Sequence, residues 1–501
     1  MSIQSPQLGV IAAGHPVTAR TGADVLRDGG NAVDAALGAM LASFACEPLL
    51  TGLGAGGYML VAPQNETPVL LDFFVEAPGR GADPAARTEL VPISVSFGDA
   101  IQVFNIGAAS VGAYGLPAGL CEAAGRFGRV PLAELVKPAV ALARDGIELN
   151  AQQAYVVEIL GGIVTATPEC AQLFAPGGRL LGTGEILRQP ELADALERLG
   201  EEGPGSFYVG DIAAAIVDWL AARGGMLTAA DLAAYTVVDR APARASYRRR
   251  DVLTNPPPSA GGILIARALA LLQALAGPLD VERIVEVMER TQAERTPEFL
   301  EGLADPQFAQ RFLSRGPSLG STTHIAVLDR DGWACSVTCS NGSCSGVVVP
   351  GTGLHLNNML GEQDLNPLGF HRHPAGTRLP SMMAPTVVLR DGEPELVLGS
   401  AGSNRIRSAI LQTIIRVVDD GLRAPDAVEA PRVHFEDGVV YAEPGIETAA
   451  LEAAGRAIGR FRERNLFFGG VQAVQRDATG TFWGGGDPRR GGAALVVGSN
   501  P

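Results

Sequence analysis

Thr322-Thr323-His324 open a predicted β-strand straight after a loop-forming run of small residues that ends at Ser321. Threonine is common in strands, so one interpretation of this start is purely structural. The other is chemical, because cleavage of the bond between Ser321 and Thr322 would free a threonine with its own amine. A free α-amino group has a pKa of about 7.7–8.0 and can act as general base for the hydroxyl of the same residue.

Such a threonine supplies nucleophile and base together, so it needs no separate Ser-His-Asp set. The six histidines of the chain show no triad-like grouping, which fits this interpretation. The Thr322 hydroxyl can make the cut itself by attacking the preceding carbonyl, which gives an ester that water hydrolyses. On this second interpretation the cut would give a helix-rich large fragment, residues 1–321, and a small catalytic fragment, residues 322–501.

The composition is that of a globular protein with a large core. Of 501 residues, 47% are hydrophobic and only 19% are charged, and this length allows two or three domains. The formal net charge of −15 argues against a nucleic-acid partner, because no basic stripe is present to neutralise phosphates.

Targeting, membrane and metal signals are weak. The first residues lack the basic and apolar regions of a signal peptide, and no run of about 18 apolar residues predicts a membrane span. The six cysteines lack the paired spacing of a zinc site, so reduced thiols in a cytoplasmic protein are the simplest interpretation. We expect no metal and no cofactor.

The first part of the chain predicts mainly helices. One is expected over Thr18–Asp28, and another over Ala32–Ala45 with Asn31 as N-cap. The glycine run over 52–57 precedes a strand and lacks a Gly-Lys-Ser/Thr ending, so it does not favour a phosphate loop. Further strands are expected over Tyr58–Ala62 and Val69–Phe74, and further helices over Leu132–Ala143, Leu192–Leu199, Ile212–Ala222 and from Ile263 onward.

After Thr322 the pattern changes to hairpins, with turns at Asp331-Gly332 and Asp391-Gly392. Helical patterns on both sides of these antiparallel strands predict a layered α+β fold with two sheets stacked between helices. The expected strands include Thr386–Leu398 as a hairpin, Val471–Gln475 and Ala493–Val497, and the expected helices are Arg405–Val418 and Thr448–Arg460.

A set of motifs in fixed order resembles the γ-glutamyltransferase (γ-glutamyl transpeptidase) family of N-terminal-nucleophile hydrolases, and it covers nearly the whole chain. The motifs are "GGNAVDAA" (29–36), "GLGAGGYML" (52–60), "VALARDG" (140–146), "NPPPSAGG" (255–262), "TTH" (322–324), "GTGLHLNN" (351–358), "LPSMMAPT" (379–386) and "GSAGSNRI" (399–406).

The resemblance implies a four-layer αββα sandwich, one autoproteolytic cut between Ser321 and Thr322, and Thr322 as nucleophile. Ser340 matches the hydroxyl residue that steadies the threonine. The backbone amides of Gly402 and Ser403 match the oxyanion hole, a role that suits small residues at a strand-to-helix turn. It also implies that the two fragments stay together as a heterodimer in one composite domain that acts on a small molecule. Ser381 matches the first of two serines in the donor site.

The donor site otherwise departs from the family. The family arginine that binds the α-carboxylate of a γ-glutamyl donor is replaced by Phe74, which cannot make a bidentate carboxylate contact. The second serine of the donor pair is Met382. The family asparagine aligns with Gly342, although Asn341 is adjacent. The two residues that grip the donor's amino group become Met359 and Glu362, and only Glu362 keeps a charge.

These departures leave three hypotheses. The enzyme acts on γ-glutamyl donors, with Arg80, Arg378 or Arg405 in place of the lost arginine. Alternatively it applies the same threonine to another compound, as an acylase or as a carbon–carbon bond hydrolase of antibiotic biosynthesis. The third is a non-catalytic binding or structural protein. Among other polar residues, His324 is expected to pack, His371 and His373 to lie in a surface loop, and Glu47 to end a helix.

Overall fold

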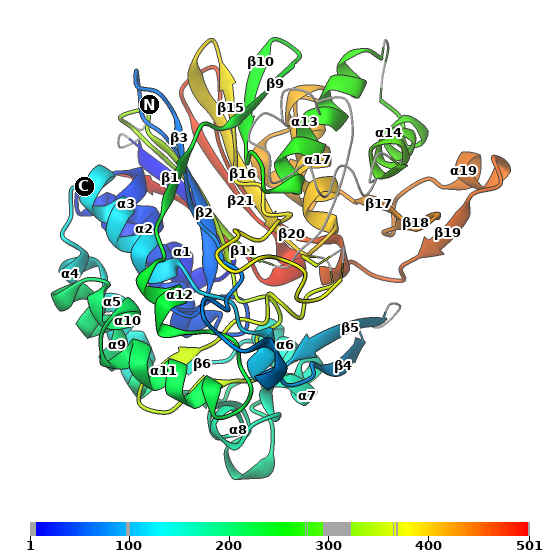
Figure 1. Ribbon diagram of the computed structural model, residues 1–501. Coiled ribbons are helices and arrows are strands. Elements are labelled where there is room, and N and C mark those ends of the chain that lie inside the picture. The colour runs from blue at the N-terminus through cyan, green and yellow to red at the C-terminus, as the bar shows by residue number, and fades with distance from the viewer. Residues whose placement is uncertain are drawn as a thin grey trace.

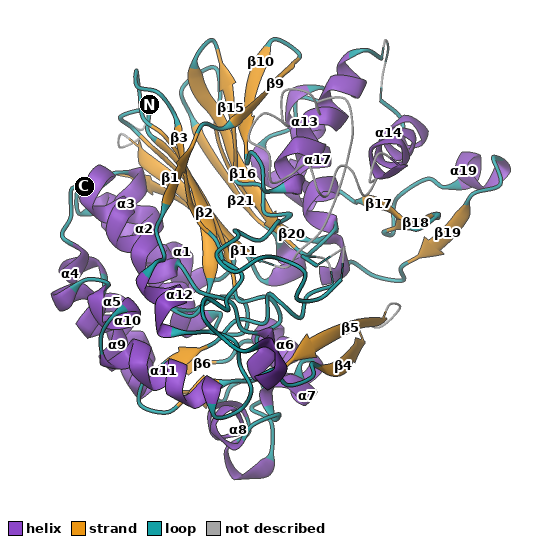
Figure 2. Cartoon of the chain, in the orientation of Figure 1, coloured by secondary structure: helices purple, strands orange, loops and turns teal. Residues whose placement is uncertain are grey.

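A computed structural model describes residues 7–96, 101–275, 277, 279–293, 322–363, 365–366 and 369–498. Ser321, on one side of the expected cut, lies outside the described residues, whereas Thr322 is described. The fold is a mixed α+β structure in which two antiparallel sheets lie next to each other and helices flank both (Figures 1 and 2).

The first sheet has seven strands in the order β22-β1-β11-β12-β2-β3-β8. The strand that begins behind Thr322, β11, lies inside this sheet between β1 and β12, so it is paired along both edges. The strands span Gln7–Ala13 (β1), Gly56–Ala62 (β2), Val69–Phe73 (β3), Val238–Arg240 (β8), Thr323–Asp329 (β11), Ala334–Ser340 (β12) and Ala493–Gly498 (β22).

The second sheet has six strands in the order β21-β20-β16-β15-β10-β9. Its β15 and β16 form the hairpin predicted around Asp391-Gly392. The strands span Ala243–Tyr247 (β9), Arg250–Thr254 (β10), Thr386–Arg390 (β15), Glu393–Ala401 (β16), Gly470–Arg476 (β20) and Phe482–Gly486 (β21).

Alternation along β11 explains how the two sheets come to face each other. Ala326 and Leu328 join a buried cluster that includes Val397 and Val474 of the second sheet. Ile325 and the other residues of opposite parity face the helices instead. The contact between sheets is close, because a Cβ added to Gly399 of β16 would lie 2.4 Å from the His324 ring.

Each sheet carries helices on its outer face (Figure 2). Helices α1 (Pro16–Arg27) and α2 (Ala32–Cys46) pack on the first sheet, and α13 (Ala260–Gln273) and α17 (Arg405–Val418) pack on the second. The other α-helices among the described residues are α3 (Leu116–Phe127), α4 (Leu132–Leu135), α5 (Lys137–Asp145), α6 (Ala151–Ile159), α7 (Gly161–Val164), α8 (Pro168–Phe174), α9 (Pro190–Glu202), α10 (Gly205–Tyr208), α11 (Asp211–Ala221), α12 (Ala229–Ala233), α14 (Val281–Ala293), α18 (Ala424–Glu429) and α19 (Ala449–Ala453).

Two predicted helices differ from the structure. The helix expected over Thr448–Arg460 is only the short α19, which ends before Gly455 at φ 76°, and β19 (Ala457–Arg460) then pairs in parallel with β18 (Val439–Ala442). The helix expected over Leu132–Ala143 is split into α4 and α5. Pro138 lies in the first turn of α5, where its missing N–H costs nothing. The helix over Arg405–Val418 is confirmed with both ends as predicted.

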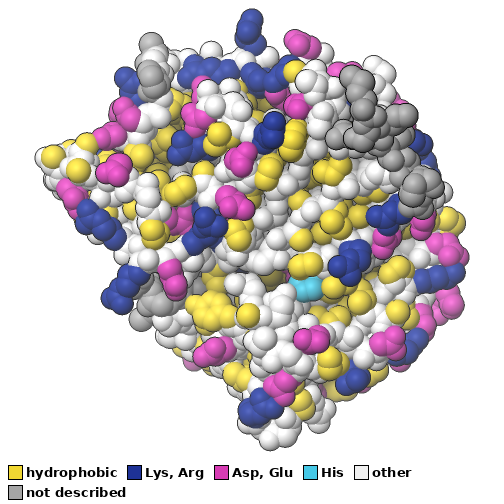
Figure 3. All heavy atoms as spheres, turned by 180° about the vertical axis from the view of Figure 1, so that it is seen from behind, with side chains coloured by type: hydrophobic (Ala, Val, Ile, Leu, Met, Phe, Trp, Pro, Cys, Tyr) yellow, Lys and Arg dark blue, Asp and Glu magenta, His cyan; other side chains and the backbone are white. Residues whose placement is uncertain are grey.

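Small sheets complete the fold. They pair β4 (Val91–Ser96) with β5 (Ile101–Ile106), β6 (Ile147–Glu148) with β7 (Ile186–Leu187), β13 (Val348–Val349) with β14 (Leu354–His355), and β17 (Val433–Glu436) with β18. In the described parts of the chain, no helix has both the length and the apolar character needed to cross a bilayer. The face in Figure 3 shows acidic and basic side chains interspersed.

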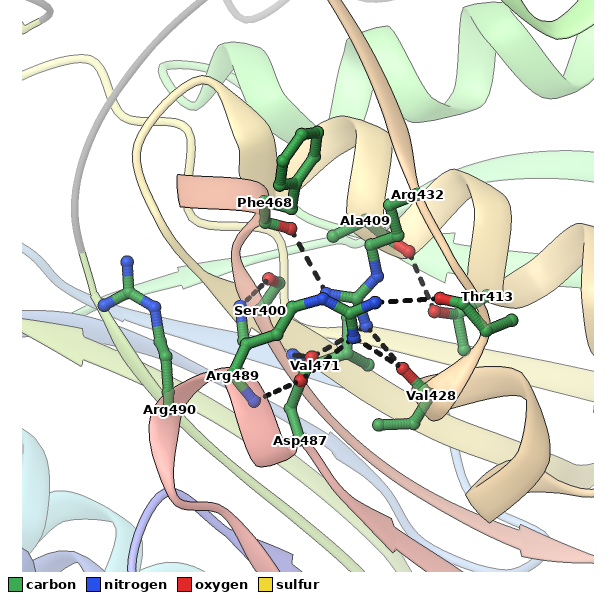
Figure 4. Close-up of polar contacts among 12 residues, drawn as sticks. Ser400, Ala409, Thr413, Val428, Arg432, Phe468, Val471, Asp487, Arg489 and Arg490 are labelled. Carbon is green, nitrogen blue, oxygen red and sulfur yellow. Dashed lines mark hydrogen bonds and ion pairs between the residues drawn. The ribbon is translucent and has the colours of Figure 1, made fainter. Parts of the chain in front are cut away.

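A buried cluster of charged side chains ties the start of β20 to the end of the chain (Figure 4). The Asp487 carboxylate accepts from the Val471 backbone N–H at 2.8 Å and pairs with Arg432 at 2.7 Å and Arg489 at 3.2 Å. Burial would raise the pKa of Asp487, but the two guanidinium groups outweigh burial and lower it. Arg489 also pairs with Glu443, so the cluster has two cations and two anions.

Replacing Asp487 should therefore destabilise the fold strongly. In Asp487→Asn the two buried arginines lose a negative partner, and breaking a buried pair in this way costs about 3–5 kcal/mol. Asp420→Asn is a matched control, since Asp420 makes a surface pair with Arg416 that is worth well under 1 kcal/mol. Urea unfolding of both variants measures the difference, and equal losses would show that the cluster adds no stability.

Candidate active site

The strand register places four sequence positions in one row across the first sheet, namely Thr322, Ser340, Gly56 and Phe74. Thr323 pairs with Cys339, Ser340 pairs with Gly56, and Gly57 pairs with Phe73. Extended by one residue, the same register sets Thr322 opposite Ser340 and sets Phe74 beside Gly56. Paired residues share a face, and this row has the parity of His324, so it faces the second sheet.

Thr322 is only 1% exposed, and its Oγ1 is buried without a hydrogen-bond partner among the described residues. Buried hydroxyls normally have a partner, so an unpartnered one calls for an explanation. The structure thus brings Thr322 and Ser340 together on neighbouring strands, as the sequence predicted. The N-terminal threonine itself stays a prediction.

Ser340 and Gly342 form a tight turn at the end of β12. The fully buried Ser340 Oγ accepts from the Gly342 N–H at 2.8 Å. Gly342 has φ 68°, and a Cβ there would lie 2.1 Å from the Asn358 Oδ1 and 2.9 Å from the Glu362 Oε1. An asparagine at position 342 would therefore need both neighbours to move.

The next two candidates, Asn341 and Glu362, are buried near this turn. The Asn341 Nδ2 donates to the His355 carbonyl at 3.1 Å, whereas its Oδ1 is buried without a partner among the described residues. The Glu362 Oε1 accepts from the backbone N–H of Ser343 at 2.9 Å and from its hydroxyl at 3.2 Å. This carboxylate oxygen is therefore engaged in holding the loop.

The serine and methionine of the donor motif have structural contacts. The Ser381 Oγ accepts from the Met383 N–H at 3.0 Å, and the Ser381 carbonyl accepts from the Ala260 N–H at 2.8 Å. The Met382 side chain is fully buried in the hydrophobic cluster beneath α13. Ser381 thus anchors the start of α13, and Met382 packs on the helix side of the second sheet.

Gly402 and Ser403 form the turn between β16 and α17. Both have positive φ, 118° for Gly402 and 60° for Ser403, and a serine in this region is strained by about 1–3 kcal/mol. A Cβ on Gly402 would lie 2.7 Å from the Gly469 Cα, so the two backbones touch. The turn follows a strand that packs face to face with β11, and Ala401 before it pairs with Gly470.

Phe74 has no polar role in the structure. Its ring is fully buried between the sheets and stacks on Tyr58 with centroids 5.3 Å apart. An arginine at this position would put a charge into this apolar layer.

Each of the three arginines considered as a substitute for the lost one is held by other groups. Arg378 lies 3.5 Å from both Asp72 and Glu76, and Arg405 donates to the Phe467 carbonyl at 2.9 Å. Arg80 is shared between Asp231 and Glu76.

The histidines behave as expected. His324 is packed between the sheets, its Nδ1 lies 2.8 Å from the Thr338 Oγ1, and burial lowers its pKa to about 3. His373 contacts the Leu365 carbonyl at 3.3 Å. Nowhere in the described ranges do three or more His, Cys, Asp or Glu side chains gather in a way that could hold a metal ion.

Glu47 is a site feature that the sequence analysis missed. It ends α2, as expected, but its Oε1 also accepts from the Thr323 hydroxyl at 3.0 Å and its Oε2 from the Thr18 hydroxyl at 3.3 Å. Burial raises the pKa of this carboxyl to about 7. A carboxyl that is buried one residue from the nucleophile could be recognised only once α2 and β11 were placed side by side.

Glu47 should give the protein a pH-dependent stability. Its pKa is about 7 in the folded state and has an ordinary value of 4.5, so between these pH values the folded protein binds more protons than the unfolded chain. Its contribution to the free energy of unfolding is complete below pH 4.5 and falls as the pH rises toward 7.

Glu47→Gln should therefore flatten this slope, whereas Glu463→Gln, a change at an exposed position, should keep it. Urea unfolding at several pH values between 4.5 and 7.5 measures it. Parallel curves for the Glu47→Gln variant and the unmodified protein would contradict the raised pKa.

Known proteins resemble this chain along nearly its whole length. The sequence profile of the family described as Gamma-glutamyltranspeptidase matches residues 18–497. The Acylase ACY 1 proenzyme of Pseudomonas sp. (strain SE83) is 31% identical over 98% of this chain and 93% of its own length. The Glutathione hydrolase proenzyme of Escherichia coli (strain K12) is 30% identical over 96% of this chain and 90% of its own.

A solved structure gives the same result. The crystal structure of cephalosporin acylase from Bacillus halodurans superposes with a TM-score of 0.85 at 26% identity, and it covers 99% of this chain and 97% of its own. The profile match, the two relatives and the shared fold agree with the ordered motifs around Thr322 and Gly402. This chain belongs to the gamma-glutamyltranspeptidase family.

Proposed function

We propose that this protein is an autoprocessed enzyme in which Thr322, once freed, transfers or hydrolyses acyl groups. The observation that carries the proposal is the buried Thr322 hydroxyl, which has no partner in the described chain and lies in register with Ser340. In maturation the Thr322 Oγ attacks the Ser321 carbonyl, the peptide C–N bond breaks, and an ester forms. Water then hydrolyses the ester, which leaves a Ser321 carboxylate and a free Thr322 amine.

In turnover the Thr322 amine takes the proton from its own hydroxyl while the Oγ attacks the donor carbonyl. The Ser340 side chain on the neighbouring strand steadies the threonine. The strained turn at Gly402 and Ser403 supplies the backbone donors for the developing oxyanion. The proton passes to the leaving group, and water or an amine then releases the acyl group from Thr322.

A single cut in one chain gives the two fragments of the mature protein. Residues 1–321 and 322–501 stay together as a heterodimer, since each of the two sheets contains strands of both fragments. We assign the fold to the four-layer αββα sandwich of N-terminal-nucleophile hydrolases. The six unpaired cysteines support a reducing, cytoplasmic location.

The donor is proposed to differ from a γ-glutamyl group. Phe74 is packed against Tyr58, and Arg378 is held by two carboxylates, so neither offers a site for an α-carboxylate. A non-glutamyl acylase is supported by the similarity to acylases, and a carbon–carbon bond hydrolase is the second candidate. The buried, unpartnered nucleophile favours an enzyme over a non-catalytic protein.

Thr322→Ala should remain a single chain and lose turnover, because it has no hydroxyl to make the cut or to attack a donor. Thr322→Ser should still be cut, since it keeps a hydroxyl and would have its own amine. Intact mass and N-terminal sequencing of the purified proteins decide this, with the smaller fragment expected to begin at residue 322. An uncut wild-type chain with full activity would refute the mechanism.

The donor itself can be tested with 4-nitroanilides. We expect kcat/KM for the γ-glutamyl anilide to be at least about tenfold below that of the best simple acyl anilide. A hydrogen bond to a charged group is worth about 1.5–3 kcal/mol, and 1.4 kcal/mol corresponds to tenfold. If the γ-glutamyl compound were the best donor, the altered-donor proposal would fail.

A further inference from the structure

The His324 ring lies between the two sheets, next to the candidate nucleophile. Thr322 and His324 are two residues apart, so their side chains point to the same face of the first sheet, about 7 Å apart along the strand. The neighbouring strand has the same order, because Thr338 pairs with His324 and Ser340 lies in the row of Thr322. His324 therefore occupies the first row behind the proposed reacting residues.

The backbone of the second sheet lies directly against this ring. A Cβ added to Gly399 of β16 would lie 2.4 Å from both the Cε1 and the Nδ1 of His324, too close for any side-chain atom. Gly399 precedes the Gly402–Ser403 turn by three residues, which is at most about 10 Å of extended chain. The ring therefore connects the strand of the nucleophile to the strand that ends in the proposed oxyanion turn.

Hydrogen bonds fix the orientation of the ring. Its Nδ1 lies 2.8 Å from the Thr338 hydroxyl, and its Nε2 lies 3.5 Å from the Ser336 hydroxyl. The Ser336 hydroxyl gives its one proton to the Leu398 carbonyl at 3.1 Å, so it can only accept from the ring. Burial lowers the pKa of His324 to about 3, so the ring is neutral at pH 7. Its single proton is therefore on Nε2, and Nδ1 accepts from Thr338.

Ser336 carries these hydrogen bonds from the first sheet into the second. Its hydroxyl also accepts from the Thr386 backbone N–H at 3.0 Å, so one side chain of β12 is bonded to both β15 and β16. The side chains of His324, Ser336 and Thr338 are all almost completely buried. A buried polar network whose members have their partners rigidifies one arrangement of its surroundings. This network holds the two sheets at a fixed separation close to Thr322.

We infer that His324 is a positioning residue, an uncharged spacer that sets the distance between Thr322 and the Gly402–Ser403 turn. The inference rests on the proposed function, since it assumes that the Thr322 hydroxyl attacks the donor and that the turn binds the oxyanion. His324 acts through the backbones of β11 and β16 rather than by contact with the donor. This distance matters for the rate, because a displacement of about 1 Å in an active site can cost about 100-fold.

The first test removes the spacer. In His324→Ala we expect kcat for the best 4-nitroanilide to fall about 100-fold while KM changes less than about threefold, because the donor still binds but the attack is misaligned. The matched control is Leu328→Ala, which also shortens a buried side chain on the inner face of β11, at the far end of the strand. It should lower the stability in urea but change kcat less than about threefold. Equal losses of kcat in the two variants, or an unchanged kcat in His324→Ala, would overturn the inference.

A double variant tests the contact between the ring and the second sheet. Gly399→Ala puts a methyl group where the ring lies, so it should displace β16 and lower kcat about 100-fold. When His324→Ala is added to Gly399→Ala, the methyl group has room, and kcat should rise at least about tenfold above that of Gly399→Ala alone. Residues in contact give such non-additive effects, so two losses that simply add would overturn the inference.

Crystal structures of the variants separate this inference from the proposed function. If the unmodified protein turns over no anilide, the proposed function fails, but the separation of the two strands can still be measured. In His324→Ala the distance between the Thr322 and Gly402 Cα atoms should change by at least about 0.5 Å, the tolerance of a productive site, and in Leu328→Ala it should stay the same. An unchanged distance in His324→Ala would overturn the inference whatever the activity.

Discussion

The pairing register of β11 with its neighbours is the constraint on which the candidate site depends. With Thr323 opposite Cys339, the residue before it faces the second sheet, and so does Ser340. Because side chains alternate along a strand, a slip of one residue would turn Thr322 toward the helices and Thr323 toward the second sheet. The apolar residues of β11 disfavour this slip. Ile325 is buried against the helices and Ala326 is buried between the sheets, so a slip would exchange their surroundings.

The second sheet adds the part of the site that the first cannot provide. Its strand β16 brings the Gly402–Ser403 turn to the edge where β11 begins, and the strained φ of Ser403 persists only if the surroundings hold it. Those surroundings are rigid for a physical reason. Ala401 pairs with Gly470 in the sheet, and the next residue, Val471, donates its backbone N–H to the Asp487 carboxylate. The two arginines that pair with this carboxylate, Arg432 and Arg489, are buried with it. A buried cluster of charges thus supports the strand that holds this backbone turn in place.

The sequence predicted the elements whose signals are local. The capping residue Asn31, the turn at Asp391-Gly392 and the helix over Arg405–Val418 are found where the patterns indicated. The predicted helix over Thr448–Arg460 was wrong beyond Ala453, because its last residues pair with β18 and a helical pattern cannot reveal that partner strand. Glu47 was missed for the same reason, because only the packing of α2 against β11 brings its carboxyl to the Thr323 hydroxyl.

Packing supports the residues that stand at positions 74 and 342. The Phe74 ring stacks on Tyr58 and fills the layer between the sheets, and Gly342 leaves just enough room for Asn358 and Glu362. An arginine at position 74 would put a charge into that apolar layer, and an asparagine at position 342 would clash with both neighbours. Replacing either residue alone is therefore not enough to build a glutamyl-type donor site, because the surrounding side chains would have to move as well.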